Sequence, residues 1–283
     1  MGQYGGYQGA PGVGDVTALP SIGLWGKVDA EMERPGLWMH EFEDFLLQPA
    51  SEAALPTTED PYHEYFAFTS TGGFVTTLDA EGGHIKIGSD GDNEGASIRS
   101  GSYPYKIIRN AGELVYECRV KMSVLTADLF DFFAGLYENT AFSAAVPISA
   151  TQNQMADDNL IGFLRDSTDA TTSATANFIV KADGNPSATT HTTIGTIGVG
   201  ALTADTWIKW GFTFNRGGDN LLRYYVNGLP LNATKDVPST QADVPSDTRL
   251  GWAFGVTNTA ATTEFPTIDW VRVAQRRATD VHP

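Results

Sequence analysis

A strongly alternating segment in the last third of the chain restricts the fold more than any other feature. The residues 206–214 read TWIKWGFTF, in which apolar and polar side chains point to opposite sides of an extended strand. A glycine-rich turn at 216–219 leads to a second extended segment, Leu221–Val226. Asn227-Gly228 then predicts a tight hairpin turn. We therefore expect consecutive antiparallel strands here.

The chain from residue 38 onward repeats this pattern of short strands and turns. With 30 Gly and 14 Pro among 283 residues, turns are frequent, and no helical pattern is long enough for a βαβ unit. The sequence predicts an all-β fold, a two-sheet antiparallel jelly-roll sandwich over residues 38–277 followed by a C-terminal tail, 278–283. Further strands are expected at 38–47, 64–69, 73–78, 84–87, 105–109, 113–123, 130–137, 159–165, 176–181, 189–199, 229–231, 250–256 and 267–274.

Residues 1–37 differ from the rest. Gly2–Gly14 is rich in Gly, Tyr, Gln and Pro and has neither strand nor helix periodicity. One or two helical turns are expected at Val28–Arg34, before Pro35. The segment is interpreted as an extended N-terminal arm that lies along another subunit, with a flexible leader as the alternative. The candidate partner-binding residues of the arm are Tyr4, Tyr7, Leu19, Ile22, Leu24 and Trp25.

The charge of the chain limits its partners. The net charge is −16, and nine of these negative charges accumulate by Glu64. This acidity argues against nucleic acid and against an anionic membrane surface, because both attract clustered Lys and Arg. An arm with this charge would more readily grip an outer protein surface.

The single cysteine and the absence of targeting patterns bear on where the protein works. Cys118 excludes an internal disulfide and a zinc site of several thiolates. It alternates with apolar residues, so we expect a buried small side chain. The N-terminus has no secretory pattern, and no apolar run approaches the length of about 20 residues that a membrane helix needs. We expect a soluble protein that is made in the host cytoplasm.

Three strand motifs resemble one fold family. These are DTWIKWGFTF at 205–214, LRYYVNG at 222–228 and IDWVRV at 268–273, and EFEDF at 41–45 fits an opening strand. Together they resemble the concanavalin A-like lectin/glucanase superfamily, which includes laminin-G-like modules. The resemblance covers roughly residues 38–277 and implies the jelly-roll fold, which hosts lectins, hydrolases and structural modules. The chain as a whole also resembles bacteriophage virion proteins of the capsid decoration (cement) type.

Glycoside hydrolysis requires two suitably spaced carboxylates. Glucanases of this superfamily carry E-x-D-x-x-E on one strand, and the nearest pattern here is Glu41-Phe42-Glu43. The third acidic position falls at Leu46, so the motif fails. We expect Glu41 and Glu43 on an exposed face opposite buried Phe42 and Leu46. No catalytic residue is therefore assigned.

Calcium and glycan sites are the remaining chemical candidates. Asp90, Asp92 and Glu94 supply hard oxygen ligands within one Gly-rich loop, and 157–159 is a weaker loop of the same kind. With Asp90 as the first position of such a loop, the twelfth is Gly101 rather than Glu, so a solvated loop is favoured and no cofactor or metal is predicted. The candidate sugar-stacking aromatics are Trp207 or Trp210, which face opposite sides of one strand, Tyr103, Tyr105, Tyr224 and Tyr225.

Three functions follow from these patterns. The leading hypothesis is a virion structural protein, a decoration protein on the outer capsid surface. Its partners would be the major capsid protein and further copies of itself, with a trimer as a suitable closed state. Deletion of residues 2–36 is expected to leave a folded domain. The alternatives are an adhesion module that binds a host glycan and a polysaccharide hydrolase.

Overall fold

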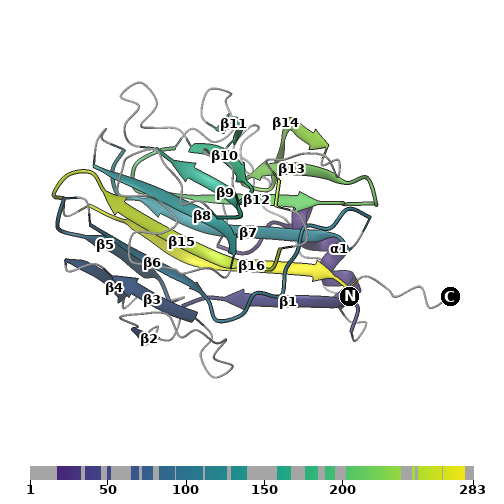
Figure 1. Cartoon of the computed structure of the whole chain (residues 1–283), viewed down its shortest axis with the longest axis horizontal. Coiled ribbons are helices and arrows are strands. Elements are labelled where there is room, and N and C mark those ends of the chain that lie inside the picture. Colours follow the sequence, from purple (N-terminus) through teal and green to yellow (C-terminus); the bar gives the residue numbers. More distant parts are fainter. Residues whose placement is uncertain are drawn as a thin grey trace.

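The computed structural model describes residues 18–32, 36–45, 50–51, 65–69, 72–78, 83–92, 94–110, 112–125, 129–138, 158–166, 176–183, 189–194, 202–236, 244–245, 248–262 and 264–277. Their strands form two sheets stacked face to face, and one helix lies at the end of the strands near β1 (Figure 1). The predicted two-sheet sandwich is confirmed. Within the described residues, no helix is long and apolar enough to span a membrane.

Sheet I carries eight strands. In spatial order they are β14 (Leu229–Asp236), β13 (Leu221–Val226), β12 (Thr206–Phe214), β7 (Leu114–Met122), β16 (Pro266–Arg276), β5 (Ile85–Ser89) and β4 (Gly73–Thr77). The eighth, β1 (Trp38–Glu43), also pairs with β16, through the segment Val271–Arg276, whereas β5 pairs with Thr267 and Ile268. One strand, β16, therefore holds β1 and β5 in the same sheet.

Sheet II also carries eight strands. Their order is β11 (Thr189–Ile194), β10 (Ala176–Lys181), β9 (Leu160–Arg165), β8 (Phe130–Glu138), β15 (Leu250–Asn258), β6 (Gly95–Ser100), β3 (Tyr65–Thr69) and β2 (Ala50–Ser51). The pairing is antiparallel throughout except between β2 and β3. Two of these strands, β6 and β2, were not predicted from the sequence. The expected strand at 105–109 is reduced to a single bridge between Tyr105 and Leu250.

The core lies between the sheets and contains alternate residues of each strand. On β7 these are Leu114, Tyr116, Cys118, Val120 and Met122, all at most 1% exposed. The expected burial of Cys118 is confirmed. Because alternate side chains face opposite ways, the other residues of β7 lie on the face of sheet I that is turned away from sheet II. We call this face the outer face of sheet I.

The helix α1 (Ile22–Met32) covers one end of that outer face. Its residues Leu24, Trp25 and Val28 lie on one side of the helix and are 0% exposed. They form a cluster with Trp38, Val115, Tyr225 and Ala274 from this same chain. The expectation that Leu24 and Trp25 serve a partner is therefore wrong, because both are already buried in the chain's own sandwich. The helix also begins earlier than the predicted turn at 28–34.

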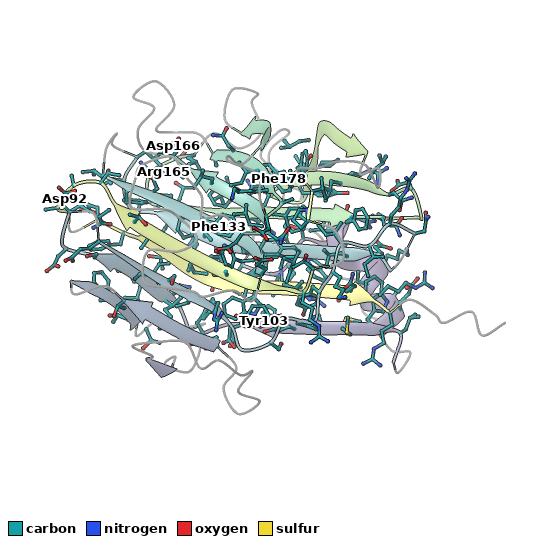
Figure 2. The ribbon with its side chains drawn as sticks, viewed as in Figure 1. Asp92, Tyr103, Phe133, Arg165, Asp166 and Phe178 are labelled. Carbon is teal, nitrogen blue, oxygen red and sulfur yellow. The ribbon has the colours of Figure 1, made fainter. Side chains whose placement is uncertain are left out.

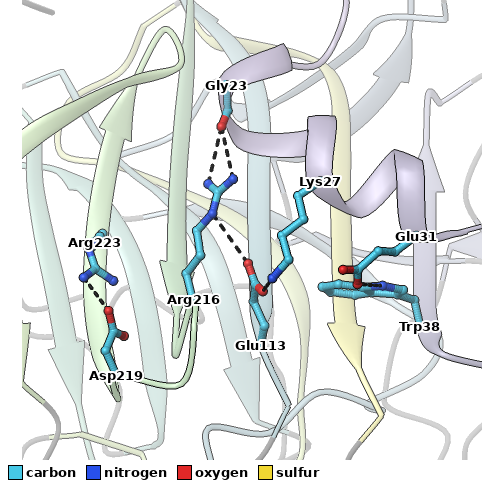
Figure 3. A network of polar contacts seen from close by, with 8 residues as sticks. All are labelled: Gly23, Lys27, Glu31, Trp38, Glu113, Arg216, Asp219 and Arg223. Carbon is cyan, nitrogen blue, oxygen red and sulfur yellow. Dashed lines mark hydrogen bonds and ion pairs between the residues drawn. The ribbon is translucent and has the colours of Figure 1, made fainter.

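Polar contacts fix α1 to sheet I. The carboxylate of Glu117 accepts hydrogen bonds from the Ser21 backbone N–H and from Trp25 Nε1, both at 2.9 Å. Arg216 donates to the Gly23 carbonyl, and Lys27 forms an ion pair of 2.7 Å with Glu113 (Figure 3). Arg216 and Glu113 also approach within 3.6 Å, so the helix, β7 and the β12–β13 turn are joined. These contacts satisfy polar groups that helix docking takes out of water.

Burial of Glu117 makes the docking of α1 sensitive to pH. Burial raises the pKa of Glu117, and the hydrogen bonds from Ser21, the charge of Lys209 and the hydrogen bond from Trp25 oppose that rise. The folded state thus binds the Glu117 proton more tightly than the unfolded chain. The stabilisation that comes from this tighter proton binding is complete below the pKa of Glu117 in the unfolded chain. It is lost as the pH rises through the pKa of Glu117 in the folded protein. In urea unfolding, wild type should lose stability relative to Glu117→Gln as pH rises above about 4.5. A pH-independent difference would contradict this.

Candidate functional site

Three glycines, Gly135, Gly162 and Gly251, open the face of sheet II that is turned away from the core. Gly135 on β8 and Gly162 on β9 are directly paired across the strands. A Cβ atom on Gly135 would lie 2.6 Å from the Gly162 Cα and 2.8 Å from the Phe133 ring, and a Cβ on Gly251 would lie 3.0 Å from the Tyr103 ring. The two aromatic rings therefore lie directly on the backbone of the sheet, where only glycine leaves room.

Arg99 and Tyr137 flank Tyr103 on the same face. Arg99 on β6 pairs with Ala253 of β15, and Tyr137 on β8 pairs with Gly251 of that strand. The Arg99 guanidinium carbon lies 5.2 Å from the Tyr103 ring centroid. Burial lowers the pKa of Arg99, while Tyr103 and Tyr137 counteract this shift. A guanidinium is thus held between two tyrosines, away from bulk water.

Two carboxyl groups meet where β8 ends and β9 begins. The Tyr137 hydroxyl donates to Asp158, and the Asn159 amide donates to Glu138. Burial raises the pKa of Glu138, the Asn159 hydrogen bond opposes this, and the adjacent Asp158 raises it further. Two neighbouring carboxylates disfavour each other's ionised form. Asn159 is held in place by the Asp183 backbone N–H, 3.1 Å from its side-chain oxygen.

These six residues form what we call the Tyr137 cluster: Arg99, Tyr103, Tyr137, Glu138, Asp158 and Asn159. Asp158 is half-buried, whereas the other members are buried. The cluster combines aromatic rings with a guanidinium, an amide and two carboxyls, which is the chemistry that hydrogen-bonds to and stacks on a polyhydroxyl ligand. Asp158 is the member through which such a ligand would first make contact.

Glu41 and Glu43, which were considered for hydrolysis but not assigned a catalytic role, lie elsewhere. Glu41 on β1 accepts hydrogen bonds from Trp252 Nε1 at 2.6 Å and Ser100 Oγ at 2.9 Å, so it joins sheet I to sheet II. Glu43 is buried and accepts the Phe45 backbone N–H at 2.7 Å. The expected orientation of this strand is wrong: Phe42 is 45% exposed and the glutamates point inward. Leu46 lies outside the described residues.

The acidic side chains of the candidate calcium loop differ in their surroundings. Glu94 accepts hydrogen bonds from the Gly72 backbone N–H and Ser89 Oγ, both at 2.9 Å. Asp90 and Asp92 are exposed, and Figure 2 shows Asp92 at the left-hand end of the sandwich, far from Tyr103. Among the described side chains, no three His, Cys, Asp or Glu residues gather as a metal site would require.

The other predicted residues are dispersed. In the arm, Leu19 and Ile22 are 69% and 62% exposed, and Tyr4 and Tyr7 lie outside the described residues. Trp210 is in the core and Trp207 is on the outer face of sheet I, as their spacing predicts. Of the four tyrosine candidates for stacking, Tyr103 belongs to the Tyr137 cluster; the three that are buried elsewhere are Tyr105, Tyr224 and Tyr225.

Comparisons with known proteins bear on this architecture. No family model matches the sequence, and no curated protein matches it. Among solved structures, peanut lectin with a bound 9mer peptide aligns with a TM-score of 0.56 and 14% identity, over 86% of this chain and 99% of the lectin. An endo-1,3-beta-glucanase from Streptomyces sioyaensis aligns with a TM-score of 0.51 and 12% identity, over 86% and 98% of the two chains.

A protein of unknown function from Shewanella oneidensis MR-1 aligns over 91% of this chain and 95% of its own, with a TM-score of 0.54 and 14% identity. The chain has the concanavalin A-like jelly-roll fold. The expected fold resemblance is thereby confirmed, whereas these comparisons give no support to the expected resemblance to virion proteins. At these identities the concanavalin A-like fold is shared, and the function has to be argued from the side chains of this chain.

Proposed function

We propose that this concanavalin A-like domain is a non-catalytic carbohydrate-binding protein, with its ligand at the Tyr137 cluster. The observation that carries the proposal is the meeting of Tyr103, Arg99 and Asp158 on one face of sheet II. The names of the structural neighbours support it, since they include lectins and a glucanase. Binding is favoured over hydrolysis because the Glu138 and Asp158 carboxyls are hydrogen-bonded to each other. Retaining enzymes separate their two carboxyls by about 5–5.5 Å.

The test is oligosaccharide binding by the full chain and by Asp158→Asn. This change keeps the size of the side chain but removes a charged acceptor, so affinity for a bound oligosaccharide should fall about tenfold. The matched control is Asp166→Asn, because Asp166 is likewise half-buried but follows β9 instead of preceding it. Titration calorimetry of both variants measures the difference. Equal losses in the two variants, or no binding to a broad oligosaccharide panel, would refute the proposal.

A reducing-sugar assay on the same ligands separates binding from catalysis. We expect no turnover. Release of reducing ends that is abolished by Glu138→Gln would replace the binding proposal with the hydrolase alternative, since Glu138 has the raised pKa of a general acid.

The decoration-protein role remains a prediction. It relied on an arm whose Leu24 and Trp25 are in fact buried in the sandwich, and within the described part of the arm the exposed candidates are Leu19 and Ile22. A particle-binding assay with Leu19→Ser and Ile22→Ser tests it without removing the helix.

A further inference from the structure

The end of the outer face of sheet I that lies away from α1 carries a second group of polar and aromatic side chains. The segment before the helix borders this group, because the Ala18 carbonyl accepts a hydrogen bond from Trp270 Nε1 and the Leu19 carbonyl accepts one from Lys209 Nζ. Helix α1 covers the end around Val115, while the end around Lys121 lies beyond it. A row of paired residues crosses that end, from Trp207 on β12 through Lys121 on β7 and Thr267 on β16 to Lys86 on β5. Trp207 and Lys121 thus lie on adjacent strands, and Lys86 lies in the same row two strands beyond Lys121.

A β-bulge adds an aspartate to this group. The register of β16 against β7 shifts between Ile268 and Trp270, which places Asp269 in the bulge. Its carboxylate contacts Arg119 with one oxygen and His84 Nε2 with the other, the latter at 3.2 Å. Asp269 therefore fixes a guanidinium and an imidazole side by side on the outer face of the sheet.

Trp207 is surrounded by these groups. The Arg119 guanidinium carbon lies 4.5 Å from the indole centroid, Lys121 Nζ lies 5.2 Å from it, and the His84 ring lies 4.9 Å from it. Trp207 is half-buried, and the side chains of His84 and Lys121 are 20% and 27% exposed. The assembly, which we call the Trp207 patch, consists of His84, Lys86, Arg119, Lys121 and Trp207.

The charges of the patch are unusual for this protein. Arg119 forms an ion pair with Asp269, Lys121 forms one of 2.8 Å with Asp205, and Lys86, which is paired with Thr267 across the strands, adds a third permanent cation to the row. The patch is net positive in a chain whose net charge is −16. Moreover, Arg119 is 8% exposed, and its Nε atom is buried with no hydrogen-bond partner among the described residues. A buried guanidinium N–H without an acceptor is costly, so it marks a place for one.

We propose that the Trp207 patch binds an oxyanion group of an acidic ligand. Arg119 and Lys121 are the charged donors, and Trp207 is the apolar wall beside them. The group can be a carboxylate, a sulfate or a phosphate. All three present negatively charged oxygens, in a planar or a tetrahedral arrangement, that accept hydrogen bonds from guanidinium and ammonium groups. The site is on the opposite sheet from the Tyr137 cluster, so it stands or falls independently of the proposed function.

The chain contains a matched pair of ion pairs with which to test this. Lys121, a member of the patch, forms an ion pair with Asp205, while Arg223–Asp219 lies on β13 and the preceding turn, outside the patch (Figure 3). The cationic side chains of both pairs are 27% exposed. Lys121→Gln should weaken binding of the oxyanion about tenfold, and Asp205→Asn should strengthen it, because it removes the anion that competes for Lys121. Arg223→Gln and Asp219→Asn should leave binding unchanged.

The probes are oligogalacturonate, inorganic sulfate and inorganic phosphate, each titrated into the full-length protein, with a neutral oligosaccharide of equal length as reference. Saturable binding of any of the three probes, with the expected ordering of variants and weakening at high salt, supports the site and identifies its chemical source. No saturable binding at millimolar concentration overturns the proposal. Equal effects of Lys121→Gln and Arg223→Gln overturn it as well, since they would reflect net charge alone. Failure of Asp158→Asn to affect neutral-sugar binding leaves these results unaffected.

Discussion

Replacing Trp25 with alanine is expected to lower the free energy of unfolding by about 3–5 kcal/mol. The indole is completely buried between α1 and sheet I, and its Nε1 donates to the buried Glu117. The substitution therefore opens a cavity and also leaves a buried carboxylate with one donor fewer. Urea denaturation should show the loss as a lower midpoint with an unchanged slope, because the rest of the sandwich still unfolds with it.

Ile22→Ala is the control for this prediction, because Ile22 lies in the same helix and is 62% exposed. Its effect should be within about 0.5 kcal/mol. Equal losses in the two variants would show that α1 is not anchored by its buried face.

By the same reasoning, deletion of residues 2–36 should destabilise the domain and not, as the sequence suggested, leave it intact. It would expose the cluster around Val115 and Tyr225 to water.

Gly135→Ala should be the most damaging change on the other sheet, at about 3 kcal/mol. Its Cβ would collide with the backbone of β9, at Ile161 O and Gly162 Cα, and with the Phe133 ring. Backbone atoms cannot rotate away as a side chain does, so β8 and β9 must separate locally. Thermal unfolding of the purified variant measures the cost.

Gly26→Ala is the matched control, and we expect it to raise the free energy of unfolding instead of lowering it. Gly26 lies inside α1, where a Cβ would have only Ile22 Cγ2 nearby, at 3.7 Å. Alanine in an exposed helix interior should stabilise by about 0.5–1 kcal/mol. If both glycine variants are destabilised alike, the close approach of β8 and β9 is not the cause of the stability loss in Gly135→Ala.

The strands were predictable because side-chain alternation is a local property. The ranges expected for β10, β12 and β13 coincide with the observed bounds. By contrast, β6 was missed, since GASIRS has small residues of low strand propensity and gains its strand conformation by pairing with β15 and β3. The start of α1 was missed for a similar reason: a helix with two glycines is stabilised by docking on sheet I, not by its own propensity.

The candidate site was only partly visible in the sequence. Tyr103 was a stacking candidate and Asp158 lay in a weak calcium candidate, but nothing in their spacing links them to each other. Arg99 and Tyr137 meet because β15, which comes more than a hundred residues later, lies between β6 and β8. Such a site has no local motif, because its members come together only through long-range strand register.

The positions of β15 and β16 also constrain the order of events during synthesis. Each is an interior strand of its sheet: β15 separates β8 from β6, and β16 separates β7 from β5 and β1. Neither sheet can therefore be completed until residues 250–276 have left the ribosome, and until then β6, β7 and β8 present unpaired edges. Contacts of this long sequence separation slow folding. Nascent chains of this protein should thus depend on chaperones that shield strand edges until the two closing strands arrive.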